Sequence, residues 1–128
     1  MPQNVAKPVL GQVHHVALAV KDLKSATDFY QDVLGLSSLA TPPEARANGI
    51  QWLDIGHGLA LHLIEVPDVT APPRTHIAIS VSDNDAWRTY ITSKNIAITE
   101  PTVDLYAAKR FFIQDPTGNL VELVEWLS

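Results

Sequence analysis

The strongest constraint on the fold is an internal repeat, because the second half of this 128-residue chain follows the pattern of the first. "HHVALAV" precedes "KDLKSATDFYQDVLG", and "THIAISV" precedes "SDNDAWRTYIT". His76 stands 61 positions after His15, and Glu122 stands 60 positions after His62. Each half carries one amphipathic helix pattern among short strand-like runs. This repeated pattern predicts two copies of one supersecondary unit.

Each half predicts a strand, a helix and three further strands. In the first half, apolar residues recur at helical spacing over residues 26–34, with Asp22 suited to the N-cap and Gly35 to the helix end. We therefore expect an α+β fold with one domain at residues 12–127, in which a proline-rich linker at 67–73 joins module 12–66 to module 74–127. The expected strands follow alternating or apolar runs at residues 13–20, 37–41, 50–55, 59–66, 76–81, 96–99, 109–114 and 119–126.

The first strand of each module has one face of large residues and one of small residues. His15 shares its face with Ala17 and Ala19, whereas His76 shares its face with Ala78 and Ser80. Valine, leucine and isoleucine occupy the opposite faces, which we expect to pack beneath the helices. Small residues beside a histidine leave room for a ligand, so these two faces are candidate binding surfaces.

The last strand of each module carries one polar residue among apolar neighbours, His62 in "LALHLIEV" and Glu122 in "NLVELVEW". A buried glutamate needs a partner, because an unpaired carboxylate in an apolar setting is costly. If the modules face each other about a pseudo-twofold axis, their first and last strands line one cavity. This cavity would hold a divalent ion (Zn, Ni, Mn, Co or Fe) and leave coordination positions for water or substrate. The four predicted ligands are His15, His62, His76 and Glu122.

Simpler explanations compete with the metal site. A single core histidine is usually satisfied by a backbone carbonyl, and Glu122 would also suit an edge strand that resists aggregation. The equivalent positions in the repeat favour metal ligands. Many metal sites use only three protein ligands, and such a site in this chain would leave out His62. We expect His57, in the "GHG" turn, to be exposed. Arg110 and Tyr106 are candidates to contact an anionic substrate; in the simpler explanation, the arginine faces solvent or pairs with an acid.

Composition excludes several classes of protein. Hydrophobic residues make up 46% of the chain and charged residues 18%, which is typical of a globular domain. A net charge of −5 argues against nucleic-acid binding, and no apolar run approaches the roughly 18–20 residues that span a bilayer. The absence of cysteine excludes disulfides, and the first residues do not resemble a secretion signal. We therefore expect a cytoplasmic protein whose partner is a small-molecule substrate.

Three stretches carry a family resemblance: "HHVALAVKDLKSATDFYQDVLGL", "THIAISVSD" and "FFIQDPTGNLVELVE". Over residues 12–127 they resemble the vicinal oxygen chelate superfamily, which includes glyoxalases, bleomycin-resistance proteins and extradiol dioxygenases. The resemblance implies two βαβββ modules that form an open, curved mixed sheet, and a homodimer that often builds each site from two chains. It also implies metal ligands on the first and last strands of each module, which are His15, His62, His76 and Glu122 in this chain.

The resemblance defines the reaction only broadly. His62 replaces the glutamate of glyoxalase I, Ala19 replaces an expected arginine, and an apolar residue near Val66 replaces an expected asparagine. These departures disfavour a lactoylglutathione lyase. The first hypothesis is a metal-dependent lyase or isomerase that binds a carbonyl or enediolate-type substrate, with Glu122 as the catalytic proton-transfer residue.

Two alternatives stay open. An extradiol-type dioxygenase would bind Fe(II) on His15, His76 and Glu122, although such enzymes usually have further catalytic residues and often four modules. A bleomycin-resistance type of protein would bind a drug in the dimer cleft without metal or catalysis. The retained ligand set counts against this last alternative.

Overall fold

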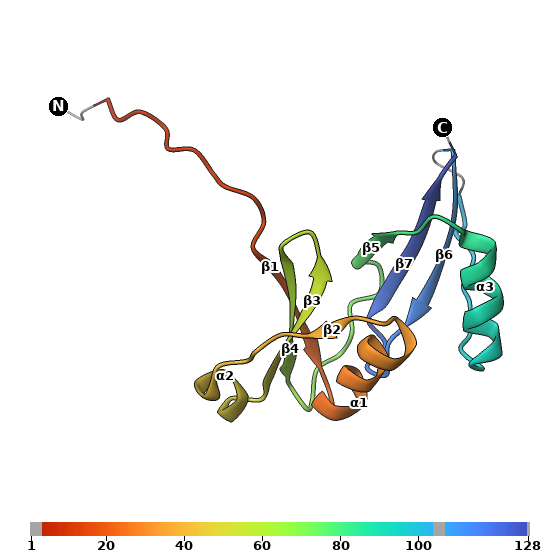
Figure 1. Ribbon diagram of the computed structural model, residues 1–128, viewed down its shortest axis with the longest axis horizontal. Coiled ribbons are helices and arrows are strands. Elements are labelled where there is room, and N and C mark those ends of the chain that lie inside the picture. The colour runs from red at the N-terminus through yellow and green to blue at the C-terminus, as the bar shows by residue number, and fades with distance from the viewer. Residues whose placement is uncertain (1–3, 104–106, 128) are drawn as a thin grey trace.

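The computed structural model describes residues 4–103 and 107–127, which form two mixed β-sheets (Figure 1). The first sheet has the strand order β1-β4-β3-β2 and the second has the order β5-β7-β6. This open arrangement confirms the α+β class. The strands are β1 (His15–Val20), β2 (Ser37–Ser38), β3 (Ile50–Gly56), β4 (Leu59–Glu65), β5 (His76–Ser80), β6 (Ala108–Gln114) and β7 (Leu120–Trp126). The helical elements are α1 (Leu23–Asp28), a π-helical turn η1 (Phe29–Val33), α2 (Pro43–Ala47) and α3 (Asn84–Ser93).

The two sheets repeat one pairing scheme. β1 runs parallel to β4, β5 runs parallel to β7, and an antiparallel strand follows on the other side of β4 and of β7. The second sheet has one strand fewer than the sequence pattern predicts. Residues 96–99 contribute a single antiparallel bridge, between Thr99 and Phe112, in place of a strand.

The helix boundaries follow the predicted capping residues. The Asp22 carboxylate accepts a hydrogen bond from the backbone N–H of Ser25, and Asp83 accepts one from that of Ala86, both at 3.0 Å. Gly35 ends the first helical segment with a φ of +81°, a left-handed conformation that favours glycine. This segment differs from a continuous α-helix because its second half, η1, winds as a π-helical turn.

A second pair of repeat-equivalent glutamates fastens the helices to the sheets. Glu65, at the end of β4, accepts a hydrogen bond from the backbone N–H of Leu23 at 2.8 Å. Glu125, 60 positions later on β7, accepts one from the backbone N–H of Asn84 at 2.9 Å. Both donors lie in the first turn of a helix, where backbone N–H groups lack intrahelical partners. These two glutamates therefore have a structural role.

The core lies between the sheets and their helices. The predicted faces are confirmed: Val20 is fully buried on β1, whereas His15 and Ala17 on the other face are exposed. On β5 the isoleucines are half-buried, and His76 is exposed. Burial of each large apolar side chain contributes about 1.5–3 kcal/mol. The buried apolar cluster comprises Val20, Ala26, Phe29, Tyr30, Leu53, Leu61, Leu63, Ile91, Phe111, Ile113, Val121 and Leu123.

The turn between β6 and β7 docks the second module onto the first. Asp115 is 4% exposed, and its Oδ1 accepts hydrogen bonds from the backbone N–H groups of residues 117–119. Its Oδ2 accepts a 2.9 Å hydrogen bond from the Tyr30 hydroxyl in η1. Burial, the charge of Asp115 and this hydrogen bond together raise the pKa of Tyr30, so the phenol stays a donor. Asn119 and Thr117 extend the junction to the backbone of Ala19 and Lys21.

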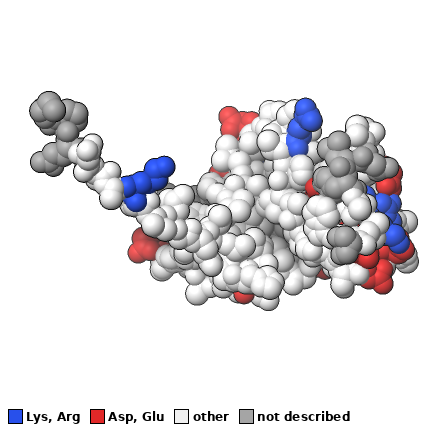
Figure 2. Space-filling model, turned by 90° about the horizontal axis from the view of Figure 1, so that it is seen from above, with Lys and Arg blue, Asp and Glu red and all other residues white. Residues whose placement is uncertain are grey.

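The N-terminal residues 4–14 contain no helix or strand and extend away from the sheets (Figure 1). Val9 and Leu10 in this arm are each 94% exposed. On the face shown in Figure 2, acidic and basic side chains both appear, scattered over a largely uncharged surface. Within the described parts of the chain, no helix has the length and apolar character needed to cross a membrane.

Candidate functional site

The four predicted ligands occur as two pairs, one on each sheet. The first-sheet pair is His15 and His62, whose rings stack with centroids 4.0 Å apart. The second-sheet pair is His76 and Glu122, with Nε2 of His76 3.0 Å from Oε1 of Glu122. Among residues 4–103 and 107–127, no three His, Asp or Glu side chains lie close enough together to hold a metal ion. The described residues of a single copy therefore present two separate pairs, which are candidate half-sites.

The first-sheet pair belongs to a column of three stacked rings. Strand register places Trp52 opposite His62, and their rings are nearly parallel with centroids 4.5 Å apart. His15 stacks against His62 at an interplanar angle of 12°. Nε2 of His62 and Nε1 of Trp52 are buried, and neither has a hydrogen-bond partner within the described residues. Buried polar atoms nearly always have partners, so this column indicates a place for a ligand, an ion or another molecule.

The environment of His62 favours its neutral form. Burial of the imidazole lowers its pKa below the ordinary value of 6.5, and the nearby His15 and His14 lower it further. A neutral imidazole with an unpartnered Nε2 is the form of histidine that binds a metal ion.

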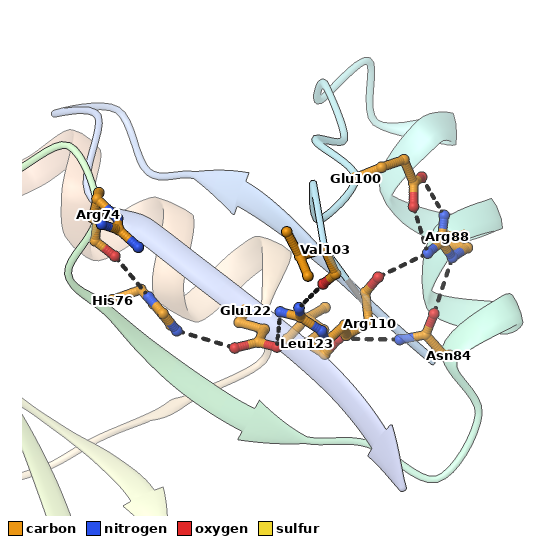
Figure 3. A network of polar contacts seen from close by, with 9 residues as sticks. All are labelled: Arg74, His76, Asn84, Arg88, Glu100, Val103, Arg110, Glu122 and Leu123. Atoms are coloured by element: carbon orange, nitrogen blue, oxygen red, sulfur yellow. Dashed lines mark hydrogen bonds and ion pairs between the residues drawn. The ribbon is translucent and has the colours of Figure 1, made fainter. Parts of the chain in front are cut away.

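The second-sheet pair is held by hydrogen bonds on both sides (Figure 3). Nδ1 of His76 lies 2.9 Å from the carbonyl oxygen of Arg74 and donates to it. The opposite ring nitrogen faces a carboxylate oxygen of Glu122, so both ring nitrogens of His76 face acceptors. A hydrogen bond between Nε2 of His76 and Oε1 of Glu122 requires a proton between these two atoms. Both imidazole and carboxylate also bind metal ions. A divalent ion is able to replace that proton, and the Arg74 carbonyl would then fix the ring orientation.

Glu122 is 2% exposed and lies on β7, the central strand of the second sheet. The explanation of Glu122 as an edge-strand charge is therefore wrong. Its second oxygen, Oε2, accepts a 3.2 Å hydrogen bond from Nη1 of Arg110, so the buried carboxylate has a cationic partner. Of the alternatives that the sequence leaves open for Arg110, the structure shows the pairing with an acid, since its side chain is 10% exposed and lies against Glu122. Tyr106 lies outside the described residues.

Aromatic side chains line both half-sites. Phe112 pairs with Glu122 across β6 and β7, and the ring of His76 meets its ring edge-on at 5.1 Å. Trp126, at the end of β7, is 56% exposed. His57 is exposed in its turn, as expected.

Each half-site opens onto a cavity large enough for part of a small molecule. The cavity of about 440 Å³ at the first-sheet pair is lined by His14, Trp52, Asp54, His57 and His62, among others. The cavity of about 480 Å³ at the second-sheet pair is lined by Arg74, His76, Thr99, Arg110, Phe112 and Glu122, among others.

The sequence relatives include two proteins named as enzymes and one uncharacterized protein. The chain is 33% identical over 125 residues to the uncharacterized protein YaeR of Escherichia coli, covering 91% of this chain and 97% of that protein. It is 31% identical over 134 residues to glyoxylase I 4 of Arabidopsis thaliana, covering 96% and 76% of the two chains. It is 27% identical over 121 residues to metallothiol transferase FosB of Staphylococcus haemolyticus, covering 87% and 81%.

Solved structures share the fold at lower identity. A glyoxalase family protein from Bacillus anthracis matches with a TM-score of 0.83 and 21% identity, covering 95% of this chain and 100% of that one. TnmS3, an antibiotic binding protein from Streptomyces sp. CB03234, matches with a TM-score of 0.75 and 22% identity, covering 94% and 100%. The family model of the glyoxalase/bleomycin resistance protein/dioxygenase superfamily matches residues 12–123. With its two mixed sheets and this match over most of its length, the chain belongs to that superfamily.

Proposed function

We propose that this protein is a metal-dependent enzyme acting on a small oxygen-bearing substrate, with each active site shared between two copies of the chain. The observation that carries the proposal is the pair of half-sites at repeat-equivalent positions. His62 offers a buried Nε2 without a partner in the described chain, and His76 and Glu122 offer two ligand atoms joined by a proton. Two nitrogens from one half-site with a nitrogen and an oxygen from the other suit a first-row divalent ion.

The exposed strand edges support a homodimer. β1 pairs only with β4, and β5 pairs only with β7, within the parts of the chain that the structure describes. Of the small residues beside the histidines, Ala17, Ala78 and Ser80 are exposed and Ala19 is half-buried. In a twofold dimer, β1 of one copy would meet β5 of the other at two equivalent seams. Each seam would bring a first-sheet pair next to a second-sheet pair.

The proposed site assigns distinct tasks to these side chains. The three histidines and Glu122 would hold the ion, which would supply Lewis acidity to an oxygen of the bound substrate. Glu122 would also move a proton to or from the substrate, at the cavity that it lines with His76 and Arg110. Trp52 and Phe112 would cover the apolar part of the substrate and exclude water.

The relatives named glyoxylase I and metallothiol transferase favour lyase, isomerase or related addition chemistry. His62 stands where glyoxalase I has a glutamate. We therefore favour a substrate other than that of a lactoylglutathione lyase. An Fe(II)-dependent ring-cleaving dioxygenase is the alternative enzyme, and metal-free binding of a small molecule is the alternative without catalysis. Activity assays separate all three.

The first test is the metal content of untagged protein by mass spectrometry, before and after reconstitution with Co²⁺, Ni²⁺, Zn²⁺, Mn²⁺ or Fe²⁺. We expect about one ion per chain. We also expect the metal-loaded protein to turn over either thiol adducts of 2-oxoaldehydes or thiol adducts of small electrophiles. Oxygen uptake with catechols would establish the dioxygenase alternative instead. Protein that binds none of these ions after reconstitution would contradict the proposal and favour the binding protein.

A further inference from the structure

Arg110 occupies the position on β6 from which a side chain reaches Glu122. Strand register pairs Phe112 with Glu122 and Arg110 with Val124, so Arg110 lies diagonally from Glu122 on the same face of the sheet. Nη1 of Arg110 lies 3.2 Å from Oε2 of Glu122, and the two side chains are 10% and 3% exposed. This ion pair is therefore well shielded from solvent.

Arg110 is itself held in place from two directions (Figure 3). Its Nη2 donates a 2.8 Å hydrogen bond to the carbonyl oxygen of Val103, in the segment that follows β5 and α3. The backbone carbonyl of Arg110 accepts a 3.0 Å hydrogen bond from Nη2 of Arg88 on α3. Arg88 in turn binds Glu100 and Asn84 through its guanidinium. The guanidinium that faces Glu122 is thus held by the Val103 carbonyl, and the backbone that carries it is held by Arg88.

The two oxygens of Glu122 therefore have different surroundings. Oε2 accepts from Arg110, whereas Oε1 faces Nε2 of His76. Replacing the proton between His76 and Glu122 by an ion leaves the contact between Oε2 and Arg110 intact. A carboxylate held in this way presents one oxygen to the ion, without freedom to rotate or to bind through both oxygens.

We propose that Arg110 is a positioning residue of this site, which holds Oε2 of Glu122 so that Oε1 serves as a single-oxygen ligand. This inference rests on the proposed function, because it assigns Glu122 to a metal ion. A guanidinium is suited to the task because its fork binds Glu122 and the Val103 carbonyl at once, whereas the ammonium of a lysine cannot reproduce the planar fork.

The test is a Co²⁺ titration of metal-free protein by calorimetry, with the visible spectrum of the Co²⁺ complex recorded alongside. We expect Arg110→Gln to weaken Co²⁺ binding by about 10- to 100-fold, the usual effect of losing a group that orients a ligand. We also expect the Co²⁺ absorption bands to change, since the freed carboxylate is able to bind through both oxygens. Arg110→Lys should fall between the wild type and Arg110→Gln.

Lys109→Gln is the matched control, because it removes the same charge from the neighbouring residue on the other face of β6. Lys109 pairs with Asp85 on α3, and its side chain is 47% exposed. We expect Lys109→Gln to keep the wild-type affinity and spectrum. Thermal unfolding of each variant separates loss of the site from loss of the fold.

Three results would overturn the inference. If folded Arg110→Gln binds Co²⁺ as tightly as the wild type, with the same spectrum, then Arg110 does not position Glu122. If Arg110→Gln does not fold, unchanged affinity and spectrum in Arg110→Lys lead to the same conclusion. If the wild type itself binds no Co²⁺, the proposed function fails and this inference fails with it, whereas a variant-specific negative result leaves the proposed function standing.

Discussion

Glu122→Gln is expected to weaken binding of a divalent ion about 100-fold or more while leaving the fold intact. The amide keeps the size of the side chain but loses the negative charge, and it is a poor ligand beside His76. Arg110 would also lose its anionic partner at 3.2 Å. Metal content after reconstitution and calorimetric titration with Co²⁺ measure the effect directly, with circular dichroism to check the fold.

Glu125→Gln provides the control for this change. Glu125 lies on the same strand, with its Oε1 accepting a hydrogen bond from the backbone N–H of Asn84. An amide oxygen accepts this bond equally well, so we expect unchanged metal binding and at most a small loss of stability. Stoichiometric metal in Glu122→Gln, at wild-type affinity, would remove Glu122 from the ligand set.

Asp115→Ala is expected to lower the free energy of unfolding by about 3–5 kcal/mol. Its Oδ1 accepts from three backbone N–H groups, and its Oδ2 accepts from the Tyr30 hydroxyl and from Asn119. Alanine removes the acceptor of the Tyr30 hydroxyl and of the backbone N–H groups of Thr117 and Asn119, and it breaks one of the direct contacts between the modules. A domain has only about 5–15 kcal/mol in total, so the variant should be close to unfolding.

Urea denaturation measures this loss, with Asp68→Ala as the control because Asp68 is an exposed carboxylate in the linker. We expect the control to change the free energy of unfolding by less than about 0.5 kcal/mol. A loss below about 1 kcal/mol in Asp115→Ala would show that this turn is not a main connection between the modules.

Much of the fold could be predicted from sequence because its determinants are local. Alternation along residues 15–20 and 76–80 identified the buried faces, and Asp22 and Asp83 cap their helices as predicted. The π-helical turn at residues 29–33 was not predictable from apolar spacing, which fits an α-helix equally well. Residues 96–99 have an apolar strand-like pattern, but only Thr99 reaches β6.

The site could be predicted only in part. The repeat identified His15, His62, His76 and Glu122 as candidate ligands, but the division into two pairs depends on how the modules sit in space. The contact of Asp115 with Tyr30 joins residues 85 positions apart, which no local pattern reveals.

Two further contacts were predictable from the sequence to different degrees. The capping role of Glu65 and Glu125 had a signal, since both occupy equivalent positions of the repeat. The ion pair of Arg110 could be predicted only as one alternative, pairing with an unnamed acid, because its side chain reaches Glu122 from a neighbouring strand by register.

The central claim is that each site combines a first-sheet pair from one copy with a second-sheet pair from another. Its most direct test is a mixed dimer, made by co-expressing a His15→Ala/His62→Ala chain and a Glu122→Gln chain with different tags. Each homodimer lacks one half of every site, whereas the mixed dimer contains one site with both halves intact and one with neither. Purification over both tags isolates the mixed dimer for metal analysis.

We expect the mixed dimer to bind about one ion, each variant homodimer to bind none, and the wild-type dimer to bind about two. The ion regained in the mixed dimer requires residues from both chains. A mixed dimer that binds no ion, beside a wild type that binds about two, would contradict the shared site and place all the ligands within one chain.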